Sequence, residues 1–370
     1  ATIDDLARAA RARIPSYAHD YLTGGIGNET CLKRNRKALD AVTFAPDMIT
    51  GPVTPDLSVE IFGQRFDLPV GIAPIGLSGL IWPRLAEHFA ASAVRANIPA
   101  ILSTVATTSL EKFAKAGSPN AWFQLYVPND DDINRSLIER ARTAGYEVLV
   151  VTVDVPALGR RPRDIKNGLS VPPRISLSTI VQSAMRPRWA VETLLAGMPE
   201  FENLTQYVPK GSDMRSAAQY TSALARGHVG PDKLKKVRDL WPGKLVVKGI
   251  MSTNDARTAI KAGADAVYVS NHGGRQLDAA RSPVEVIADI AKAAGPDIPV
   301  FADSGIRSGL DAARMLAAGA SFTFAGRPFA WGAAAMGPHG VDHVVHILEN
   351  ELQTTMTQLG CPSISDLKLD

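Results

Sequence analysis

The stretch from Ala266 to Asp278 places a histidine and an arginine in one loop directly after an apolar run. Ala266 to Val269 has the β-branched and aromatic composition of a buried strand. His272 and Arg275 follow it, separated by two glycines that permit a tight turn and a close approach of the backbone to a ligand. Histidine titrates near neutral pH, and the planar guanidinium of arginine suits a carboxylate. The loop therefore predicts a base beside an anion-binding group.

Three other polar residues that could assist this chemistry also end apolar runs. Asp154 follows one such run, and an aspartate beside a histidine fixes the tautomer and stabilises the imidazolium formed on proton transfer. The alternative for Asp154 is a helix N-cap. Tyr126 offers a hydroxyl that can hydrogen-bond a substrate or transition state. Lys248 ends a third run, where the alternative is a buried lysine paired with a carboxylate.

Strand-like apolar runs alternate with amphipathic helical stretches, such as 85–96, 133–144, 253–262 and 309–318, along most of the chain. This alternation indicates an α/β fold of right-handed βαβ units, and eight units indicate a closed (β/α)8 TIM barrel. No Gly-x-Gly-x-x-Gly turn is present, which disfavours a doubly wound sheet. The predicted strands are 69–73, 100–103, 122–126, 148–153, 245–248, 266–270, 299–302 and 322–325.

The loops after the seventh and eighth predicted strands are candidates for a phosphate site. In a (β/α)8 barrel the carboxyl ends of the strands share the catalytic face, and these two loops commonly bind phosphate. Here they are 303–309 and 325–328, and both contain glycine and an arginine, Arg307 or Arg327. By position alone, the loops would fit any phosphorylated ligand.

The chain is expected to form a single domain, 1–370, with three segments added to a barrel at 66–335. Residues 1–65 contain an amphipathic helical pattern at 3–13 and a helix followed by a glycine stop at 15–27. The interval 167–240, after the fourth strand, is far too long for one βα unit and is expected to be functional or mobile. Residues 336–370 are expected to contain a C-terminal helix.

The sequence Ser-Asn-His-Gly-Gly-Arg-Gln-Leu-Asp at 270–278 resembles the signature of the FMN-dependent L-2-hydroxy acid dehydrogenases and oxidases, and the resemblance covers nearly the whole chain. It implies FMN as cofactor and oxidation of a 2-hydroxy acid to the 2-oxo acid. In this family, His272 would be the base, with Asp154 as its partner and Tyr126 on the substrate. Lys248 would lie beside flavin N1, where a cation stabilises the reduced ring. The substrate carboxylate would be bound by Arg275, with Tyr21 and Arg161, and Tyr126 would complete the substrate-binding set.

The same resemblance folds residues 1–65 over the barrel mouth and brings Tyr21 to the substrate. The residues by themselves favour a core aromatic at Tyr21 and a solvent-facing side chain at Arg161. The FMN-contacting positions that the resemblance implies are Ala73, Pro74, Ile75, Ser103, Gln124, Thr152, Lys248, Ser270, Asp303, Ser304, Gly305, Arg307, Gly326 and Arg327.

Two positions bear on the substrate and the electron acceptor. Val105 stands where family members that oxidise glycolate carry a bulky tryptophan, so a lactate- or mandelate-like substrate is expected. Residues 74–83 resemble the mandelate-oxidising members, including Gly76 where many oxidases have alanine. This favours a dehydrogenase that passes electrons to a quinone or cytochrome. The alternatives are an oxidase that reduces O2 to H2O2 and, more remotely, a flavin-free phosphate-binding barrel enzyme. Whether His272 takes the Cα proton or the hydroxyl proton is left open.

Residues 179–204 resemble an insertion of the bacterial L-lactate dehydrogenases that contributes to membrane association. Peripheral membrane contact is therefore expected through 174–232, with Trp189 flanked by Arg186 and Arg188 as an interfacial anchor. An ordinary solvated loop is the alternative. The expected location is cytoplasmic, with peripheral attachment at the inner face of the cell membrane.

Composition restricts the remaining function classes. Hydrophobic residues make up 45% and charged residues 21% of the chain, which is typical of a globular protein. The net charge of only +3 indicates no nucleic-acid partner. The N-terminus is expected to be a helix rather than a signal peptide, and the longest charge-free stretch, 68–83, is too short to span a membrane. Cys31 and Cys361 are expected to be free buried thiols.

No metal site is expected, because the histidines at 339, 343 and 346 are interpreted as one face of a helix. Family members are often tetramers, so a homo-oligomer is expected by analogy.

Overall fold

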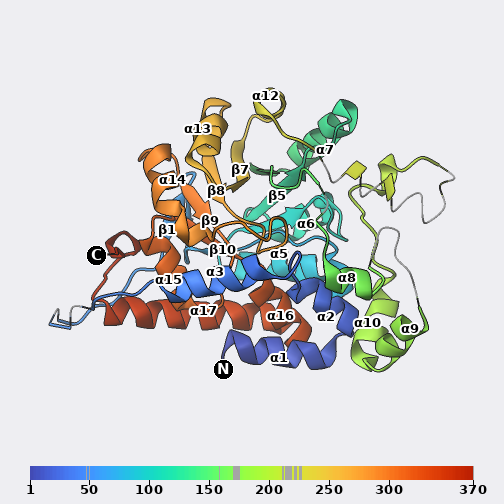
Figure 1. Cartoon of the computed structure of the whole chain (residues 1–370), viewed down its shortest axis with the longest axis horizontal. Helices are drawn as coiled ribbons and strands as arrows, with labels where there is room; N and C mark the ends of the chain where they lie inside the picture. Colours follow the sequence, from blue (N-terminus) through green and yellow to red (C-terminus); the bar gives the residue numbers. More distant parts are fainter. Residues whose placement is uncertain are drawn as a thin grey trace.

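The centre of the molecule is a closed barrel of eight parallel strands in the order β10-β3-β4-β5-β6-β7-β8-β9 (Figure 1). The computed structural model describes residues 1–46, 48–49, 51–157, 159–169, 176–210, 212, 219–220, 223–224 and 227–369. The predicted (β/α)8 barrel is confirmed, and every strand overlaps the apolar run that predicted it. The strands are β3 (Val70–Ile72), β4 (Ala100–Ser103), β5 (Ala121–Tyr126), β6 (Val148–Thr152), β7 (Lys244–Ile250), β8 (Ala266–Val269), β9 (Val300–Ala302) and β10 (Phe322–Ala325).

The two ends of the barrel interior differ in chemistry. Every second residue of a barrel strand points inward. On β5, Trp122 belongs to the apolar cluster inside the barrel, whereas Gln124 is a buried polar residue two positions later. On β7, Val246 and Lys248 have the same relation. The interior is therefore apolar toward the amino ends of the strands and polar toward the carboxyl ends.

Aromatic rings fill the amino-terminal end. A hairpin of β1 (Val59–Ile61) and β2 (Gln64–Phe66) packs against it, with Phe62 and Phe66 contacting Trp122 at ring-centre distances of 6.0 and 6.4 Å. The rings of Phe301, Phe322 and Phe324 lie within 5.2 to 6.2 Å of one another. Such contacts add to the stabilisation from area burial alone. This end of the barrel is closed by packing.

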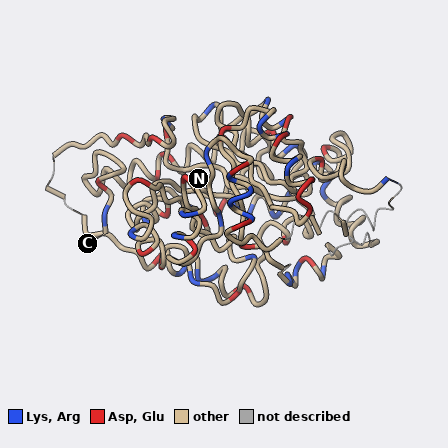
Figure 2. Tube along the Cα trace, turned by 90° about the horizontal axis from the view of Figure 1, so that it is seen from above, with Lys and Arg blue, Asp and Glu red and all other residues tan. Residues whose placement is uncertain are grey.

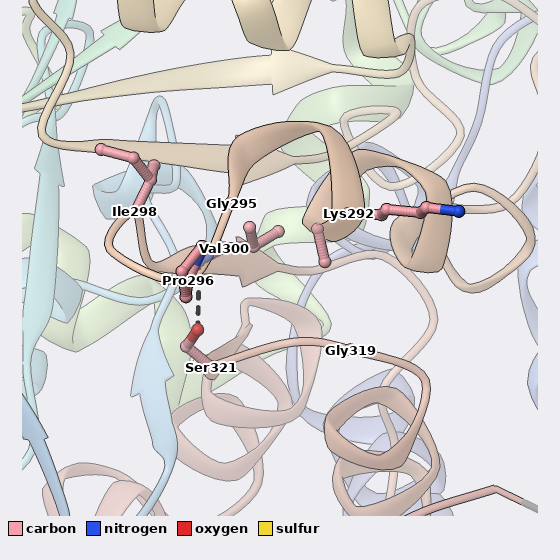
Figure 3. Close-up of a pocket in the computed structure, with 8 residues that line it drawn as sticks. Lys292, Gly295, Pro296, Ile298, Val300, Gly319 and Ser321 are labelled. Carbon is pink, nitrogen blue, oxygen red and sulfur yellow. Dashed lines mark hydrogen bonds between the residues drawn. The ribbon is translucent and has the colours of Figure 1, made fainter.

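Two surface hollows lie toward the closed end. One, of about 650 Å³, is lined by residues that include Phe62, Trp241 and Lys244, and its Arg238 and Lys244 both pair with Asp265. The other, of about 360 Å³, lies between α14 (Ile287–Ala294) and the start of β10 (Figure 3). There, the Ser321 hydroxyl accepts the N–H of Val300 at 3.1 Å, and Lys292 extends away from the hollow. Asp265 of the first hollow is thus paired with two cations, and Ser321 of the second is engaged with the backbone.

Helices surround the barrel because their apolar faces pack on the outer faces of the strands. Several begin at side-chain N-caps, as at Ser109, Asp130, Ser252 and Ser308. These outer helices are α4 (Ser78–Ile81), α5 (Leu85–Arg95), α6 (Leu110–Gly117), α7 (Asp131–Thr143), α12 (Pro231–Leu240), α13 (Thr253–Lys261), η2 (Pro283–Glu285), α14 (Ile287–Ala294), α15 (Gly309–Ala317), α16 (Arg327–Met336), α17 (Pro338–Gln358) and η3 (Ile364–Asp366).

The N-terminal segment adds α1 (Ile3–Arg13), α2 (Ser16–Thr23) and α3 (Thr30–Asp40), which run beside α16 and α17 (Figure 1). Thr2 and Asp5 form a reciprocal capping box at the start of α1. Gly24 ends α2, as the predicted glycine stop requires. Cys31, on α3, and Cys361 are buried free thiols, which confirms the prediction for both.

The insertion after β6 forms a helical hairpin beside α2. It contains α8 (Pro162–Lys166), α9 (Leu177–Ala184), α10 (Pro187–Ala196) and η1 (Thr205–Tyr207). The prediction that Trp189 is an interfacial anchor was wrong, because its side chain is only 6% exposed. Its Nε1 donates to the Ile81 carbonyl at 3.2 Å, and its ring meets Tyr17 edge-on at 6.0 Å. Trp189 therefore fastens the hairpin to the barrel.

The described part of the chain contains no helix with the length and apolarity needed to cross a bilayer. Within the same residues, no group of three or more His, Cys, Asp or Glu side chains is placed to share a metal ion. Asp342, between the histidines of α17, instead accepts from Ser92 at 2.6 Å and pairs with Arg95. Basic and acidic residues are interspersed along the trace (Figure 2).

Candidate active site

The carboxyl ends of the strands bring the predicted polar residues to one mouth. In strand order from β5 to β9, they include Tyr126, Thr152, Lys248, Ser270 and Asp303. The loop after β8 adds His272 and Arg275. Positions far apart in the sequence therefore lie around a single rim, opposite the aromatic end of the barrel.

His272 contacts two of the predicted residues. Its Nδ1 is 3.0 Å from Asp154 Oδ1, and its Nε2 is 3.4 Å from the Tyr126 hydroxyl oxygen. If Nδ1–H donates to the carboxylate, Nε2 carries the free lone pair. The residue has a φ of +59°, a left-handed conformation that is uncommon outside glycine, and its N–H donates to Ser270 Oγ at 3.0 Å. The backbone is held in this conformation by its surroundings.

Asp154 is placed against His272 by an irregularity in β7. Gly249 lies at a shift in the β7–β8 register and has a φ of +104°. A Cβ at this position would lie 2.7 Å from Asp154 Cβ, so only glycine leaves the space. Burial by itself would raise the pKa of Asp154, but the charge and hydrogen bond of His272 and the charge of Lys248 hold it below its ordinary 3.8. Asp154 is therefore an ionised partner of His272.

Lys248 is buried in a polar chain that reaches the His272 loop. Its Nζ donates to Ser270 Oγ at 2.8 Å and lies 3.2 Å from Asp303 Oδ2. Ser270 donates in turn to Asp303 Oδ1 at 2.6 Å. The carboxylate pairing considered for Lys248 is thus real, and the pair stands at the mouth. Ser304, which has a φ of +76°, also donates to Asp303 and accepts the N–H of Gly273.

Arg275, Arg161 and Tyr21 form a cationic corner of the mouth. Arg275 Nη1 donates to the carbonyls of Tyr21 and Gly24 at 2.7 and 3.0 Å, and its guanidinium carbon is 5.0 Å from the centre of the Tyr21 ring. Arg161 is 6.0 Å from the same ring and pairs with Asp164 at 3.3 Å. Burial and the charge of Arg161 lower the pKa of Arg275 to about 10. The corner therefore carries more positive than negative charge.

The structure shows where the Tyr21 and Arg161 side chains lie, for which the residues alone favoured a core position and a solvent-facing position. Tyr21 is not enclosed in the core; it lies beside both arginines, and its hydroxyl donates to the Gly76 carbonyl at 3.0 Å. The Arg161 side chain retains only 23% exposure and does not face solvent. Both residues belong to the mouth, where the resemblance placed them.

Arg307 and Arg327 follow β9 and β10. Arg327 donates to three backbone carbonyls, those of Leu22, Gly273 and Gly24, at 2.9 to 3.0 Å. Arg307 donates to the Ile306 carbonyl and lies 4.8 Å from the centre of the Trp331 ring. Burial and neighbouring cations lower the pKa of Arg307 to about 10 and that of Arg327 well below its ordinary value. Among the described residues, neither has a carboxylate within ion-pair distance.

Helix α3 fixes the loop that carries His272, and the sequence did not predict this role. Asn35 and Asn271 exchange side-chain amide hydrogen bonds of 2.9 and 2.6 Å, and both are buried. Asp278 accepts the N–H groups of Asn28 and Cys31 at the start of α3. A signal was present, because Asn35 falls four residues after Cys31 on the apolar face of the helix.

Comparisons with known proteins agree over the whole chain. The family model for FMN-dependent dehydrogenases matches residues 10–370. The chain is 37% identical over 368 residues to (S)-mandelate dehydrogenase of Pseudomonas putida, covering 100% of this chain and 92% of that protein. It is 38% identical over 367 residues to an L-lactate dehydrogenase of Xanthomonas axonopodis pv. citri, covering 99% and 94%. A crystal structure described as monotopic membrane protein (S)-mandelate dehydrogenase matches with a TM-score of 0.93 at 37% identity, covering 99% and 97%.

The chain belongs to the FMN-dependent dehydrogenase family. The mouth fits the cofactor that the family uses, on observations independent of the match. The side-chain nitrogen of Gln124 and the hydroxyl of Thr152 are buried at the carboxyl ends of β5 and β6 and have no hydrogen-bond partner in the described part of the chain. Buried polar groups need such partners, and the polar edge of an isoalloxazine supplies them. The uncompensated cations Arg307 and Arg327 fit its phosphate.

The remaining predicted FMN positions also line this mouth. Ala73 to Ile75 follow β3. Ser103 ends β4, and its hydroxyl donates to Gln124 at 3.0 Å. Gly326 lies beside Ala73, since a Cβ built on Gly326 would be 3.7 Å from the Ala73 Cβ. Gly305 has a φ of +110° and lies beside α3. The positions that the resemblance implied for FMN therefore lie together at the carboxyl ends of the strands, and their contacts with the cofactor remain a prediction.

Gly76 and Val105 border the Tyr21 side of the mouth. A Cβ at Gly76 would lie 2.8 Å from Val105 Cγ2, so alanine here would displace the valine. The Leu77 N–H donates to the Val105 carbonyl at 2.7 Å, which ties the two loops together. Valine leaves space that a larger side chain at position 105 would fill.

Proposed function

We propose that this FMN-dependent dehydrogenase oxidises an L-2-hydroxy acid, lactate- or mandelate-like, to the 2-oxo acid. The observation that carries the proposal is the placement of the His272–Asp154 pair beside the cationic corner of Arg275, Arg161 and Tyr21. A base and a carboxylate site at one barrel mouth are what such a substrate requires. In this proposal the whole chain forms one catalytic domain. Residues 1–65 are the segment that lies beside the barrel mouth.

The cationic corner binds and orients the acid. Arg275 is held by the carbonyls of Tyr21 and Gly24, so its guanidinium plane is fixed before a ligand arrives. Burial and the charge of Arg161 lower the pKa of Arg275. A bound substrate carboxylate would supply the negative charge that this corner lacks. Arg161, 6.0 Å from the centre of the Tyr21 ring, and the Tyr21 hydroxyl would complete the carboxylate site. Because the substrate carboxylate is anchored, its C2 carbon is directed toward His272.

His272 holds the proton that leaves the substrate. Its Nε2 accepts the proton, and the resulting imidazolium is stabilised by the ionised Asp154 at Nδ1. The Tyr126 hydroxyl, 3.4 Å from Nε2, can donate to the substrate oxygen. Burial and the charge of Asp154 raise the pKa of Tyr126 far above neutral, so it stays a donor. The same residues serve removal of the Cα proton or of the hydroxyl proton.

Bound at this mouth, FMN would supply the acceptor for the two electrons that leave the substrate carbon. Gln124, Thr152 and Lys248 would hold its ring, and Arg307 and Arg327 its phosphate. Lys248 keeps a positive charge buried at the mouth, where it compensates negative charge gained on reduction. Electrons would then pass to a quinone or cytochrome.

The exposed side chains of the α9–α10 hairpin favour electron transfer at a membrane surface. Eight apolar side chains of this hairpin and its C-terminal end are between 49% and 80% exposed. This far exceeds scattered surface hydrophobics and is typical of a membrane or protein contact. We infer that the hairpin rests on a lipid surface, held to the barrel by Trp189. The eight are Leu177, Ile180, Val181, Met185, Val191, Leu194, Leu195 and Met198.

The function is tested by anaerobic mixing of the FMN-loaded enzyme with a panel of L- and D-2-hydroxy acids. We expect bleaching of the flavin absorbance by one or more L-acids and none by their D-enantiomers. Failure of every acid to bleach the flavin would contradict the proposal. In air, stoichiometric H2O2 at the rate seen with a dye acceptor would contradict the quinone or cytochrome acceptor but not the substrate class.

The membrane contact is tested by flotation with anionic phospholipid vesicles. The double variant Leu194→Glu/Leu195→Glu should lose flotation and keep dye-coupled activity, because both side chains are 75% or more exposed and point away from the packed interior. Val94→Glu, a 41% exposed apolar position on α5, is the matched control and should float like wild type. Equal flotation of all three proteins would contradict the contact.

A further inference from the structure

Tyr268 stands at the boundary between the two chemistries of the barrel interior. It pairs with Lys248 in the β7–β8 register, and both side chains are buried inside the barrel. Its ring stacks on Phe324 at 5.1 Å with an interplanar angle of 27° and meets Phe301 at 6.2 Å. The Lys248 ammonium is 4.9 Å from the centre of the same ring. The aromatic cluster thus ends directly at the buried cation.

This distance makes the ring a partner of the ammonium. A cation within about 6 Å of an aromatic centroid is attracted by the ring quadrupole, most strongly where both are desolvated. Lys248 is 3% exposed and Tyr268 is 0% exposed, so water screens little of this attraction. Ser270 and Asp303 bind the ammonium through hydrogen bonding and charge. The ring is an additional contact, from the aromatic cluster.

The Tyr268 hydroxyl does not explain the residue. It is buried, and among the described residues no hydrogen bond of normal geometry reaches it, although the Asp303 carboxylate lies close by. Burial, the negative charge of Asp303 and this close contact raise the pKa of Tyr268 well above its ordinary 10, so the phenol stays neutral. The ring, rather than the hydroxyl, is the part of this side chain that faces the ammonium.

We propose that Tyr268 is a positioning residue for Lys248: its ring face holds the ammonium at the mouth, so that the cation stands where the FMN ring binds. The inference rests on the proposed role of Lys248 and extends it to a residue that touches neither substrate nor cofactor. Without the ring, the lysine chain loses one of its contacts and can settle into the vacated space. The positive charge would then lie farther from the cofactor.

The test measures reversible binding of sulfite to the FMN-loaded, oxidised protein. Sulfite adds to the flavin more tightly when a cation lies near N1, so its dissociation constant reports the placement of that charge independently of turnover. Tyr268→Leu should weaken sulfite binding by about tenfold, which corresponds to the loss of one desolvated cation–π contact. Tyr268→Phe keeps the ring and should stay within about twofold of wild type.

Two controls separate the possible failures. Phe322→Leu removes a ring from the same aromatic cluster without touching Lys248, and should leave sulfite binding unchanged. Lys248→Met removes the cation and should weaken binding far more than Tyr268→Leu. If Lys248→Met weakens binding but Tyr268→Leu matches Phe322→Leu, the role of Tyr268 is overturned alone. If Lys248→Met has no effect, the role of Lys248 fails, and with it the inference.

Should Tyr268→Leu fail to fold, Tyr268→Met provides the same comparison, because methionine fills irregular space. An unchanged sulfite dissociation constant in Tyr268→Met would overturn the proposal. A Tyr268→Phe variant weakened as much as Tyr268→Leu or Tyr268→Met would also overturn it, because the hydroxyl would then carry the effect.

Discussion

The two ends of the barrel interior are built on the same strands but are completed in different ways. At the amino end, the rings of Trp122, Phe301, Phe322 and Phe324 fill the space and pack on one another. At the carboxyl end, Gln124 and Thr152 keep unpaired buried polar atoms, and Arg307 and Arg327 lack a paired carboxylate among the described residues. One end is complete as a folded chain, and the other is completed by a ligand.

This difference follows from the residue types two positions apart on each strand. Every second side chain of a barrel strand points inward, so each strand contributes one residue to the amino end of the interior and one to the carboxyl end. On β5 these residues are Trp122 and Gln124. Apolar closure stabilises the fold whether or not a ligand is present. Polar groups at the mouth cost stability until they are paired. The barrel thus separates a stabilising half from a functional half, and substitutions in the halves should have separable effects.

The largest expected effect is on catalysis at the open end. His272→Ala should lower the rate of flavin reduction by substrate by about 10²- to 10⁴-fold, because the base that receives the proton is lost. Bound FMN and the midpoint of urea unfolding should change little. Anaerobic stopped-flow absorbance measures the rate, and His346→Ala, an exposed histidine on α17, is the matched control. Flavin reduction at the wild-type rate in His272→Ala would remove this residue from the mechanism.

The converse effect is expected at the closed end. Phe322→Ala should reduce the free energy of unfolding by about 3 to 5 kcal/mol, the usual range for deleting a fully buried ring. The folded fraction should still reduce its flavin at the wild-type rate, because Phe322 lies in the aromatic cluster away from the mouth. Urea titration and stopped-flow on the same preparation measure both. A large loss of rate in the folded protein would show that the two ends are not independent.

Removal of FMN sharpens the comparison further. At a free FMN concentration of a hundred times Kd, the cofactor should add about 2.7 kcal/mol to the free energy of unfolding, and stripping it should remove this amount. The loss should be the same in wild type and in Phe322→Ala, because distant sites add. Thermal melts with and without added FMN give the two differences. Unequal losses would mean that closure of one end prepares the other.

Much of this division could be predicted from the sequence, because it depends on local pattern and on barrel topology. The apolar runs gave the strands within a residue or two at most ends, and the carboxyl ends of those strands gave the residues that the structure brings to the mouth. Topology supplies the three-dimensional step, since strand ends separated by many residues must meet in a closed barrel. The resemblance added the roles, which remain predictions until the experiments above are done.

The features that were missed depend on contacts between distant segments. Trp189 was expected at an interface because it lies between two arginines, but Tyr17 and Ile81 bury it. Asn35 has no local reason to be functional; its partner, Asn271, arrives from the far side of the chain. Gly249 shows its purpose only when Asp154 is seen against it. None of these partners can be assigned by periodicity.

A smaller effect concerns pH at the open end. The pKa of Asp154 is held below its ordinary 3.8 in the folded protein, so its pairing contributes stability that is fully present above that value and is lost as the pH falls through the folded pKa. The difference in unfolding free energy between wild type and Asp154→Asn should therefore not shrink at neutral or mildly acidic pH, and should shrink only in stronger acid. Urea titrations across this range test it. A difference that already shrinks between pH 7 and 5 would place the titrating group elsewhere.

The smallest expected effect lies on the boundary, at Tyr268. No described residue forms a hydrogen bond of normal geometry with the buried Tyr268 hydroxyl. Tyr268→Phe removes this polar atom and keeps the packed ring, so it should raise the free energy of unfolding by about 1 kcal/mol. Urea titration of the FMN-free proteins isolates this change from cofactor binding, and Phe322→Leu in the same cluster should shift stability in the opposite direction. A loss of stability in Tyr268→Phe would mean that the hydroxyl is paired in solution, and that the polar half of the barrel includes Tyr268 at the level of Lys248.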